Sequence, residues 1–153
     1  MKKILPFFIL TFLAVLLIIA ILNKNRLNNF ISDKMKEQTT STDSVSAVKL
    51  IEIKYNYVKN GQDFDFTLLE FGSNGCTICK QMEPVLEEIS SQKDPKVNVS
   101  FLNIMHPENL LLMKYYGISA VPMQILLDKQ GIEFYRHYGF IPAEKLLTEL
   151  IRK

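Results

Sequence analysis

The sequence contains two cysteines, Cys76 and Cys79, three positions apart. They lie where an apolar, strand-like pattern gives way to a helical one. Two thiols at this spacing at the start of a helix can form a reversible disulfide, and the free amide groups of the first helical turn favour the thiolate form of the leading sulfur. We therefore expect Cys76 to be an accessible nucleophile that attacks disulfides. Cys79, one turn into the helix, is expected to resolve the mixed disulfide.

A carboxyl group precedes this pair by six positions. Glu70 lies in the short apolar run of residues 66–71, which is typical of a central strand buried on both faces. A carboxylate in such surroundings is costly to ionise, so we expect a pKa raised toward neutrality and a role in exchanging protons with Cys79. The alternative is a glutamate at a strand edge that points into solvent, which the apolar neighbours disfavour.

Metal binding and a permanent structural disulfide are the rival interpretations of the two cysteines. A structural zinc site takes four ligands, and the remaining candidates, His106 and His137, lack the close spacing of a zinc finger. We predict no metal site and no cofactor. The net charge of +2, with acidic and basic residues interspersed, gives no basic stripe and excludes nucleic acid as a partner.

Strand and helix patterns alternate around these residues. Strands are expected at residues 66–71, 97–104, 123–127 and 132–138, and helices are expected to begin at residues 76, 107 and 142. The short, glycine-bearing turn between the last two strands predicts an antiparallel hairpin and therefore a mixed sheet. The pattern predicts an α/β fold with a central mixed sheet flanked by helices. Residues 48–58 fit a strand period and a helical period equally well.

The beginning of the chain differs in composition from the rest. Residues 4–22 contain no charged residue and, as a helix, would extend about 28 Å, close to the hydrocarbon thickness of a bilayer. We predict an N-terminal transmembrane anchor at residues 1–23 that contacts the lipid bilayer through residues 4–22. The alternatives are a cleaved signal peptide and a buried core helix. Positive residues flank the run on both sides, and the usual orientation of a short basic N-terminus places the rest outside the cytoplasm.

Two further segments follow the predicted anchor. Residues 24–46 are polar and predict a linker without enough apolar surface to order itself, although part of residues 23–36 could extend the anchor as an interfacial helix. Residues 47–153 are predicted to form the folded domain.

From about Phe66 to the C-terminus the chain resembles the thioredoxin family. The resemblance rests on four landmarks in order, at residues 68–72, residues 76–80 with Pro84 downstream, residues 116–122 and residues 138–140. It implies a cis peptide bond before Pro122, a proline that lies against the disulfide in similar proteins. It also implies that the backbone of Val121 binds an extended substrate peptide by strand addition.

Three departures from the family pattern affect the expected redox properties. Gly75 stands where an aromatic residue commonly precedes the first cysteine, and the chain has no tryptophan. Thr77 and Ile78 lie between the cysteines, where general reductants and strong oxidants of the family have other pairs of residues. Phe101 stands where many thioredoxins have a lysine near the buried acid.

The resemblance implies a thiol:disulfide oxidoreductase of a bacterial cell membrane, single-pass, with its catalytic domain extracytoplasmic. Anchored relatives often serve as reductants, so the implied substrates are disulfides of exported proteins. The implied electron donor is a membrane thiol-transfer protein. The alternative is a thioredoxin-like module that binds peptides or delivers metal without catalysing exchange.

Overall fold

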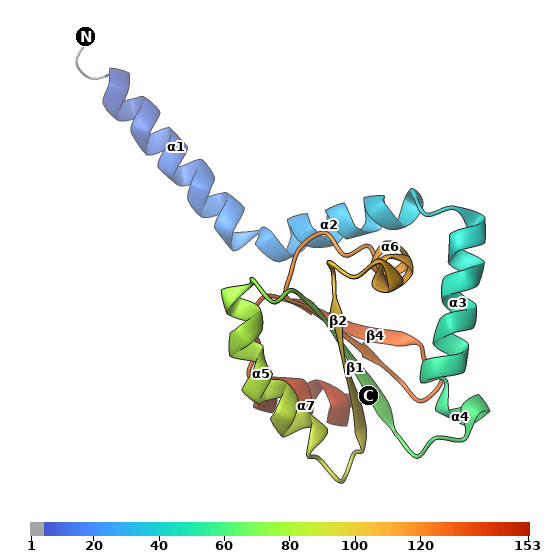
Figure 1. The fold of residues 1–153 in the computed structure, drawn as a ribbon. Coiled ribbons are helices and arrows are strands. Elements are labelled where there is room, and N and C mark those ends of the chain that lie inside the picture. Colours follow the sequence, from blue (N-terminus) through green and yellow to red (C-terminus); the bar gives the residue numbers. More distant parts are fainter. Residues whose placement is uncertain (1–4) are drawn as a thin grey trace.

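The computed structural model describes residues 5–153, without the side chains of residues 5–7, 24 and 25. Its centre is a four-stranded sheet in the order β2-β1-β3-β4 (Figure 1). The strands are β1 (Phe66–Gly72), β2 (Val97–Asn103), β3 (Met123–Leu127) and β4 (Glu133–Tyr138). Strand β1 is parallel to β2, whereas β3 is antiparallel to both of its neighbours, β1 and β4. The prediction of a mixed sheet that ends in an antiparallel hairpin is confirmed.

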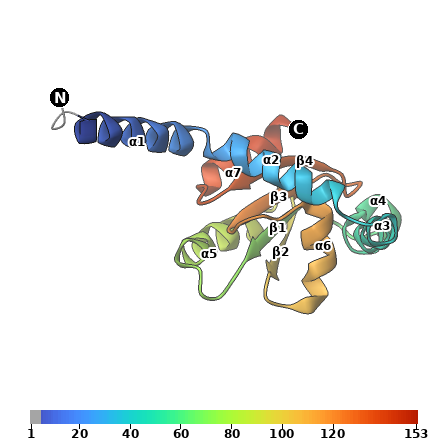
Figure 2. The same cartoon turned by 90° about the horizontal axis from the view of Figure 1, so that it is seen from above.

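Helices cover both faces of this sheet (Figures 1 and 2). In chain order they are α1 (Leu5–Leu22), α2 (Lys24–Glu37), α3 (Ser41–Tyr55), α4 (Tyr57–Asn60), α5 (Thr77–Ser90), the 3-10 turn η1 (Pro107–Asn109), α6 (Leu110–Tyr116) and α7 (Ala143–Arg152). Alternation along β1 divides the core, because Leu68 packs with α5 and α7 whereas Leu69 and Phe71 pack with α3 and α6. The sheet therefore has two apolar faces, as predicted for its central strand.

The ambiguous segment at residues 48–58 is helical. Ala47, Ile51 and Tyr55 recur every four residues and are buried on one face of α3. The Thr40 hydroxyl accepts a hydrogen bond from the Asp43 amide at 3.1 Å and so caps the start of this helix. The strand period in this segment is therefore incidental, because Ile53, which it would place on the same face as Ile51 and Tyr55, is 61% exposed.

Residues 24–46 are not the unstructured linker that their composition predicts. Most of this segment belongs to α2 and to the first turns of α3. The carbonyl oxygen of Ser32 approaches the end of α6 so closely that a β-carbon on Gly117 would lie 2.2 Å from it. Gly117 also has a φ of +64°, which favours glycine. Helix α2 packs on α6 through backbone contact and small residues, which composition does not reveal. A helix here fits the stated alternative for part of residues 23–36. The domain boundaries themselves stay a prediction.

Helix α1 is apolar along its length, and its side chains from Phe8 onward are exposed. Among the described residues, no single helix has both the length and the apolarity of a membrane span, while Phe8–Leu22 and Arg26–Glu37 meet that test together as a pair bent by 64°. Residues 1–4 of the predicted anchor lie outside the described part of the chain.

Candidate active site

The two cysteines are joined by a disulfide at the start of α5, with Cα atoms 5.2 Å apart. Cys76 has an extended backbone and is the N-cap residue of α5, where its sulfur accepts a hydrogen bond from the Cys79 amide at 3.1 Å. The Cys76 amide donates to the Ser73 carbonyl at 3.1 Å, which closes the turn between β1 and α5. Cys76 is partly exposed and Cys79 is only 4% exposed. This is the arrangement that an attacking and a resolving sulfur require, although the roles stay a prediction.

Glu70 lies on the same face of the sheet as Cys79. Side chains alternate along β1, so Leu68 and Glu70 both point toward α5 and α7. A side chain at position 72 would point the same way. A β-carbon on Gly72 would lie 3.4 Å from Sγ of Cys79. Glu70 is therefore two residues along β1 from Gly72, where the strand faces the buried sulfur.

The surroundings of Glu70 make its neutral form favourable. Its side chain is 0% exposed, in a strand with a neighbour on each side. Burial raises the pKa of Glu70 to about 8, and the Gln124 amide opposite has a smaller, lowering effect. The alternative of a solvent-exposed glutamate at a strand edge is wrong, because β1 is an inner strand. The predicted proton relay with Cys79 is not tested by this geometry.

Sequence reasoning missed Gln124. It pairs with Glu70 across β1 and β3, and it is also 0% exposed. Neither oxygen of Glu70 and neither polar atom of the Gln124 amide has a hydrogen-bond partner. The available signal was a lone amide within the apolar run of residues 123–127, two positions after Pro122.

Pro122 lies at the same end of the sheet as the cysteine turn. Phe71 near the end of β1 pairs with Met123 at the start of β3, so the residues just before β3 are beside the chain that leads to Cys76. The Val121–Pro122 peptide bond is cis. The Pro122 carbonyl accepts a hydrogen bond from the Gly139 amide at 2.9 Å, and Val121 is partly exposed. The structure thus brings the predicted peptide-binding residues to the end of the sheet that carries the cysteines.

Phe101 covers the β2 side of the site. It pairs with Glu70 across β1 and β2, and its side chain is 46% exposed. A pocket of about 260 Å³ lies between α5 and β2, and its walls include Phe101, Cys79, Lys80 and Glu83. An apolar ring therefore lies beside the buried carboxyl on this side, with the charged groups of α5 at the pocket wall.

The two histidines do not join the cysteines. The imidazole of His106 lies 3.3 Å from the Glu108 carboxylate and 3.5 Å from the Asn103 amide. Nε2 of His137 lies 3.1 Å from the Phe140 carbonyl oxygen. Within residues 5–153, no group of three or more His, Cys, Asp or Glu side chains is arranged to hold a metal.

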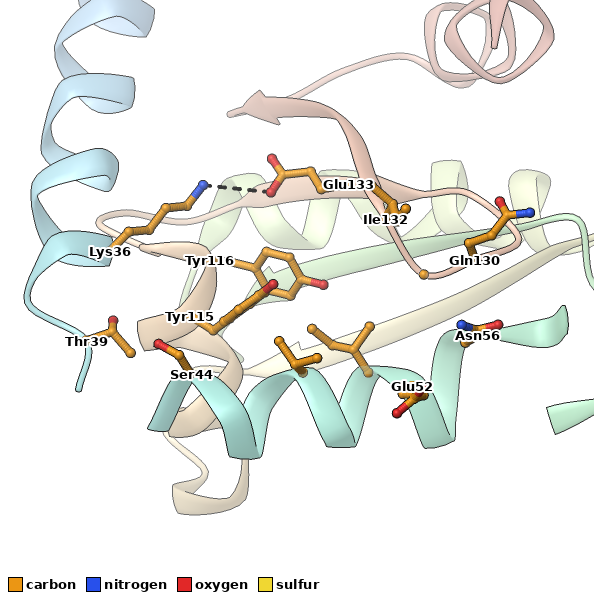
Figure 3. Close-up of a pocket in the computed structure, with 13 residues that line it drawn as sticks. Lys36, Thr39, Ser44, Glu52, Asn56, Tyr115, Tyr116, Gln130, Ile132 and Glu133 are labelled. Carbon is orange, nitrogen blue, oxygen red and sulfur yellow. Dashed lines mark ion pairs between the residues drawn. The ribbon is translucent and has the colours of Figure 1, made fainter. Parts of the chain in front are cut away.

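A larger pocket of about 540 Å³ lies on the opposite face of the sheet, among α2, α3, α6 and the turn before β4 (Figure 3). Its lining includes Tyr116 and Ile51, which belong to the core under α3 and α6. Lys36 and Glu133 form an ion pair at 3.8 Å at one end of it. It contains neither cysteine and is separated from Glu70 by the sheet.

The protein has an α/β fold with a mixed central sheet. The cysteine pair begins the helix that follows the inner strand β1, and a buried acid and a cis-proline lie near the same end of the sheet. This combination is that of a protein with a redox-active disulfide. The sequence profile described as a thioredoxin-like domain matches residues 53–152, and the chain belongs to this family. The predicted resemblance to thioredoxins is confirmed.

Similar proteins agree with this assignment. The chain is 27% identical over 127 residues to the thiol:disulfide interchange protein DsbD of Haemophilus influenzae, covering 70% of this chain and 21% of DsbD. It is 36% identical over 64 residues to a thioredoxin of Rickettsia bellii, covering 42% of this chain and 58% of that protein. The chain thus spans about a fifth of the length of DsbD.

Two solved structures are similar in fold. A thioredoxin-like protein from Clostridium perfringens has a TM-score of 0.54 and 26% identity, covering 63% of this chain and 76% of that one. A thioredoxin from Halobacterium salinarum NRC-1 has a TM-score of 0.52 and 26% identity, covering 60% and 77%.

Proposed function

We propose that this chain is a membrane-anchored thiol:disulfide oxidoreductase whose folded domain lies outside the cytoplasmic membrane of a bacterium. It exchanges the Cys76 and Cys79 dithiol with disulfides of exported proteins and acts as their reductant. The observation that carries the proposal is the disulfide at the N-terminus of α5, with Cys76 partly exposed and Cys79 buried.

The reaction begins with the reduced dithiol. The Cys76 thiolate attacks one sulfur of a substrate disulfide, that S–S bond breaks, and one substrate thiolate leaves. Cys79 then gives its proton to the Glu70 carboxylate and attacks Sγ of Cys76, which releases the second substrate thiolate. The substrate gains two electrons and the protein is left with its own disulfide. Glu70 returns the proton to a departing thiolate.

The environment of Glu70 suits this proton transfer. A general acid or base works best when its pKa is close to the working pH and to the pKa of its partner. With a pKa of about 8, Glu70 is much closer to a thiol than an ordinary glutamate is. It can therefore accept a proton from Cys79 and return it without a large energetic step.

Substrate peptides bind beside Pro122. The partly exposed Val121 precedes β3 at the end of the sheet next to the cysteine turn, where its backbone groups can pair with an extended chain. Two exposed side chains can offer apolar contact to the peptide. Ile78 lies two residues after Cys76, and Phe140 follows Gly139, whose amide donates a hydrogen bond to the Pro122 carbonyl. This mode recognises the peptide backbone more than particular side chains.

Anchoring in the lipid bilayer is assigned to residues 4–22. The side chains of α1 from Phe8 onward are exposed and, apart from Thr11, apolar, which supports a lipid environment for that helix. An exported reductant needs electrons from inside the cell, so a membrane thiol-transfer protein is the proposed donor. The similarity to a part of DsbD, a thiol:disulfide interchange protein, supports this placement.

Reduction of insulin by dithiothreitol tests the proposal with the full chain in detergent. The wild-type protein is expected to accelerate insulin precipitation, and Cys76→Ser and Cys79→Ser are expected to abolish the acceleration. Ser90→Ala, at the far end of α5, is the matched control and should keep full activity. Absence of acceleration, or full activity in Cys76→Ser, would overturn the proposal.

Trapping distinguishes catalysis from mere binding. Cys79→Ser leaves the attacking sulfur but removes the resolving one, so mixed disulfides with substrate should accumulate and should disappear when Cys76 is also replaced. Peptide binding without any covalent adduct would support the non-catalytic module instead. A glutathione redox titration of the same protein then gives the direction of electron flow, and a potential on the oxidising side of its compartment would contradict the reductant role.

A further inference from the structure

Four residues form a row across the sheet on the face that α5 and α7 cover. The strand registers pair Phe101 of β2 with Glu70 of β1, Glu70 with Gln124 of β3, and Gln124 with His137 of β4. The same face holds the pair of Leu68 and Leu126, two residues farther along β1 and β3 from the cysteines. The buried carboxyl therefore has an apolar ring on one side and a primary amide on the other.

The amide and the carboxyl are both fully buried and both lack partners. Glu70 and Gln124 are 0% exposed, and none of their four terminal oxygen and nitrogen atoms has a partner in full hydrogen-bond geometry, although the Gln124 amide is close enough to lower the pKa of Glu70. A buried polar group without a partner is destabilising, because it has lost its hydrogen bonds to water. Residues directly opposite each other in a sheet have neighbouring side chains. Glu70 lies opposite Phe101 on one side, which cannot form a hydrogen bond, and opposite Gln124 on the other. The Gln124 amide is therefore the neighbouring group that can form a hydrogen bond with the Glu70 carboxyl.

An amide suits a carboxyl that changes its protonation state. The amide nitrogen donates to a carboxylate, and the amide oxygen accepts from a protonated carboxyl, so one side chain can serve both forms. It also adds no charge. A cation in the same place would hold Glu70 ionised, whereas Gln124 stabilises the carboxylate only modestly against the effect of burial.

We propose that Gln124 is the positioning residue of the Glu70 carboxyl, holding it by hydrogen bonds in both protonation states while it exchanges a proton with Cys79. This inference rests on the proposed function, because it assigns a partner to the acid that the proposed mechanism uses. Gln124 acts through Glu70 and does not itself react.

Other ionisable groups around this face come from α5, β4 and α7. Helix α7 contributes Lys145 and Glu149, which line a pocket with Tyr135 and His137 of β4. Tyr135 also packs against the core side chains on this face. Helix α5 contributes Cys76 and Cys79, with Lys80 and Glu83 exposed at the wall of the adjacent pocket. Strand β4 contributes His137, which is half-buried and lies beyond Gln124 in the row. Phe101 faces Glu70 from β2, and α7 packs here with the apolar side chains of Ala143, Leu146 and Leu150. Gln124 is thus the polar side chain that the register places opposite Glu70.

The test measures the step in which Cys79 resolves a mixed disulfide. The full chain in detergent is joined through Cys76 to a fluorescent peptide thiol at pH 4 and then jumped to a series of pH values from 5.5 to 10. Peptide release is followed by fluorescence. The variant is Gln124→Met, which keeps the length of the side chain but cannot hydrogen-bond as an amide does. Leu126→Met, on the same strand and face, is the matched control.

We expect Gln124→Met to raise the pH midpoint of peptide release by about 1 pH unit, because the amide's hydrogen bond to the carboxylate is stronger than its hydrogen bond to the neutral carboxyl. Leu126→Met should leave the midpoint unchanged. In a Glu70→Gln background, Gln124→Met should no longer shift the midpoint, because the amide acts through that carboxyl. Infrared titration of the protonated carboxyl band, assigned by its loss in Glu70→Gln, should show the same upward shift.

The outcomes separate the two proposals. An unshifted midpoint and carboxyl band in Gln124→Met, or an equal shift with and without Glu70, would overturn this inference and leave the proposed function standing. An unchanged pH profile in Glu70→Gln itself would overturn the proton relay and this inference together. Insulin reduction in the same preparation reports independently whether dithiol exchange occurs. If Gln124→Met does not fold, Gln124→Leu replaces it, with thermal unfolding as the check for both.

Discussion

The ring of Phe101 fills the space that a side chain on Gly72 would occupy. A β-carbon built on Gly72 would lie 2.6 Å from Cε2 of Phe101, well inside van der Waals contact. The two residues lie on the adjacent strands β1 and β2, two residues apart in register, because Gly72 pairs with Asn103 and Phe101 pairs with Glu70. The close approach places the aromatic ring beside the buried Cys79 sulfur, so the size of the residue at position 72 decides whether Phe101 can lie there.

Gly72→Ala is therefore expected to destabilise the protein by about 1–2 kcal/mol, because the added methyl group must displace the half-exposed ring. In a Phe101→Ala background the same substitution should cost less than about 0.5 kcal/mol, since the obstructing ring is gone. Urea unfolding of the four proteins in this cycle gives the coupling energy. Gly75→Ala, where a β-carbon would meet nothing within 4 Å, is the control. Equal costs of Gly72→Ala in both backgrounds would contradict the relationship.

The stability of the folded protein should fall with rising pH because of Glu70. Its pKa is about 8 in the folded protein and 4.5 for an ordinary glutamate, so between these values the folded state binds more protons than the unfolded state. Folding stability then decreases as pH rises through this window and is constant above it. We expect Glu70→Gln to match the wild type near pH 4 and to be more stable by about 2–4 kcal/mol at pH 9. Denaturant unfolding across the pH range checks this, and a difference that does not grow with pH would refute it.

Local patterns were enough to predict most of the fold. The two short strand-like runs at residues 123–127 and 132–138, with a glycine-bearing turn between them, predicted the hairpin of β3 and β4. The helical period after Cys76 specified α5 and its buried face, including Met82 and Ile89. In each of these cases, the side chains that define the element are neighbours along the chain.

Contacts between distant segments could not be predicted in the same way. The packing of α2 depends on Ser32 meeting Gly117, and nothing near either residue marks the other as its partner. The pairing of Glu70 with Gln124 depends on the register of β3 against β1, and a slip of one residue would move Gln124 to the other face. The buried acid was recognisable from its apolar neighbours, but its amide partner required the sheet.

The role of the Cys76 sulfur as a helix cap predicts different effects for two substitutions. The sulfur accepts a hydrogen bond from the Cys79 amide, which a serine hydroxyl can also do and an alanine side chain cannot. Both variants lose the disulfide, so their difference isolates the cap. We expect Cys76→Ser to be more stable than Cys76→Ala by about 1 kcal/mol. Urea unfolding gives this difference, and amide exchange at Cys79 should be faster in the alanine variant. Equal stability and equal exchange would show that the cap contributes nothing.

A single introduced tryptophan can test the proposed membrane anchor, because the chain has none of its own. Phe12 is exposed on the apolar α1 and Val45 is exposed on α3, so Phe12→Trp and Val45→Trp place the same probe in the anchor and in the domain. After reconstitution of the full chain into phosphatidylcholine and phosphatidylglycerol vesicles, brominated lipids should quench the tryptophan at position 12 strongly. They should quench the one at position 45 little, because only hydrocarbon-embedded side chains contact the bromine atoms. Similar quenching at both positions, or failure of the chain to float with the vesicles, would contradict an anchor at residues 4–22.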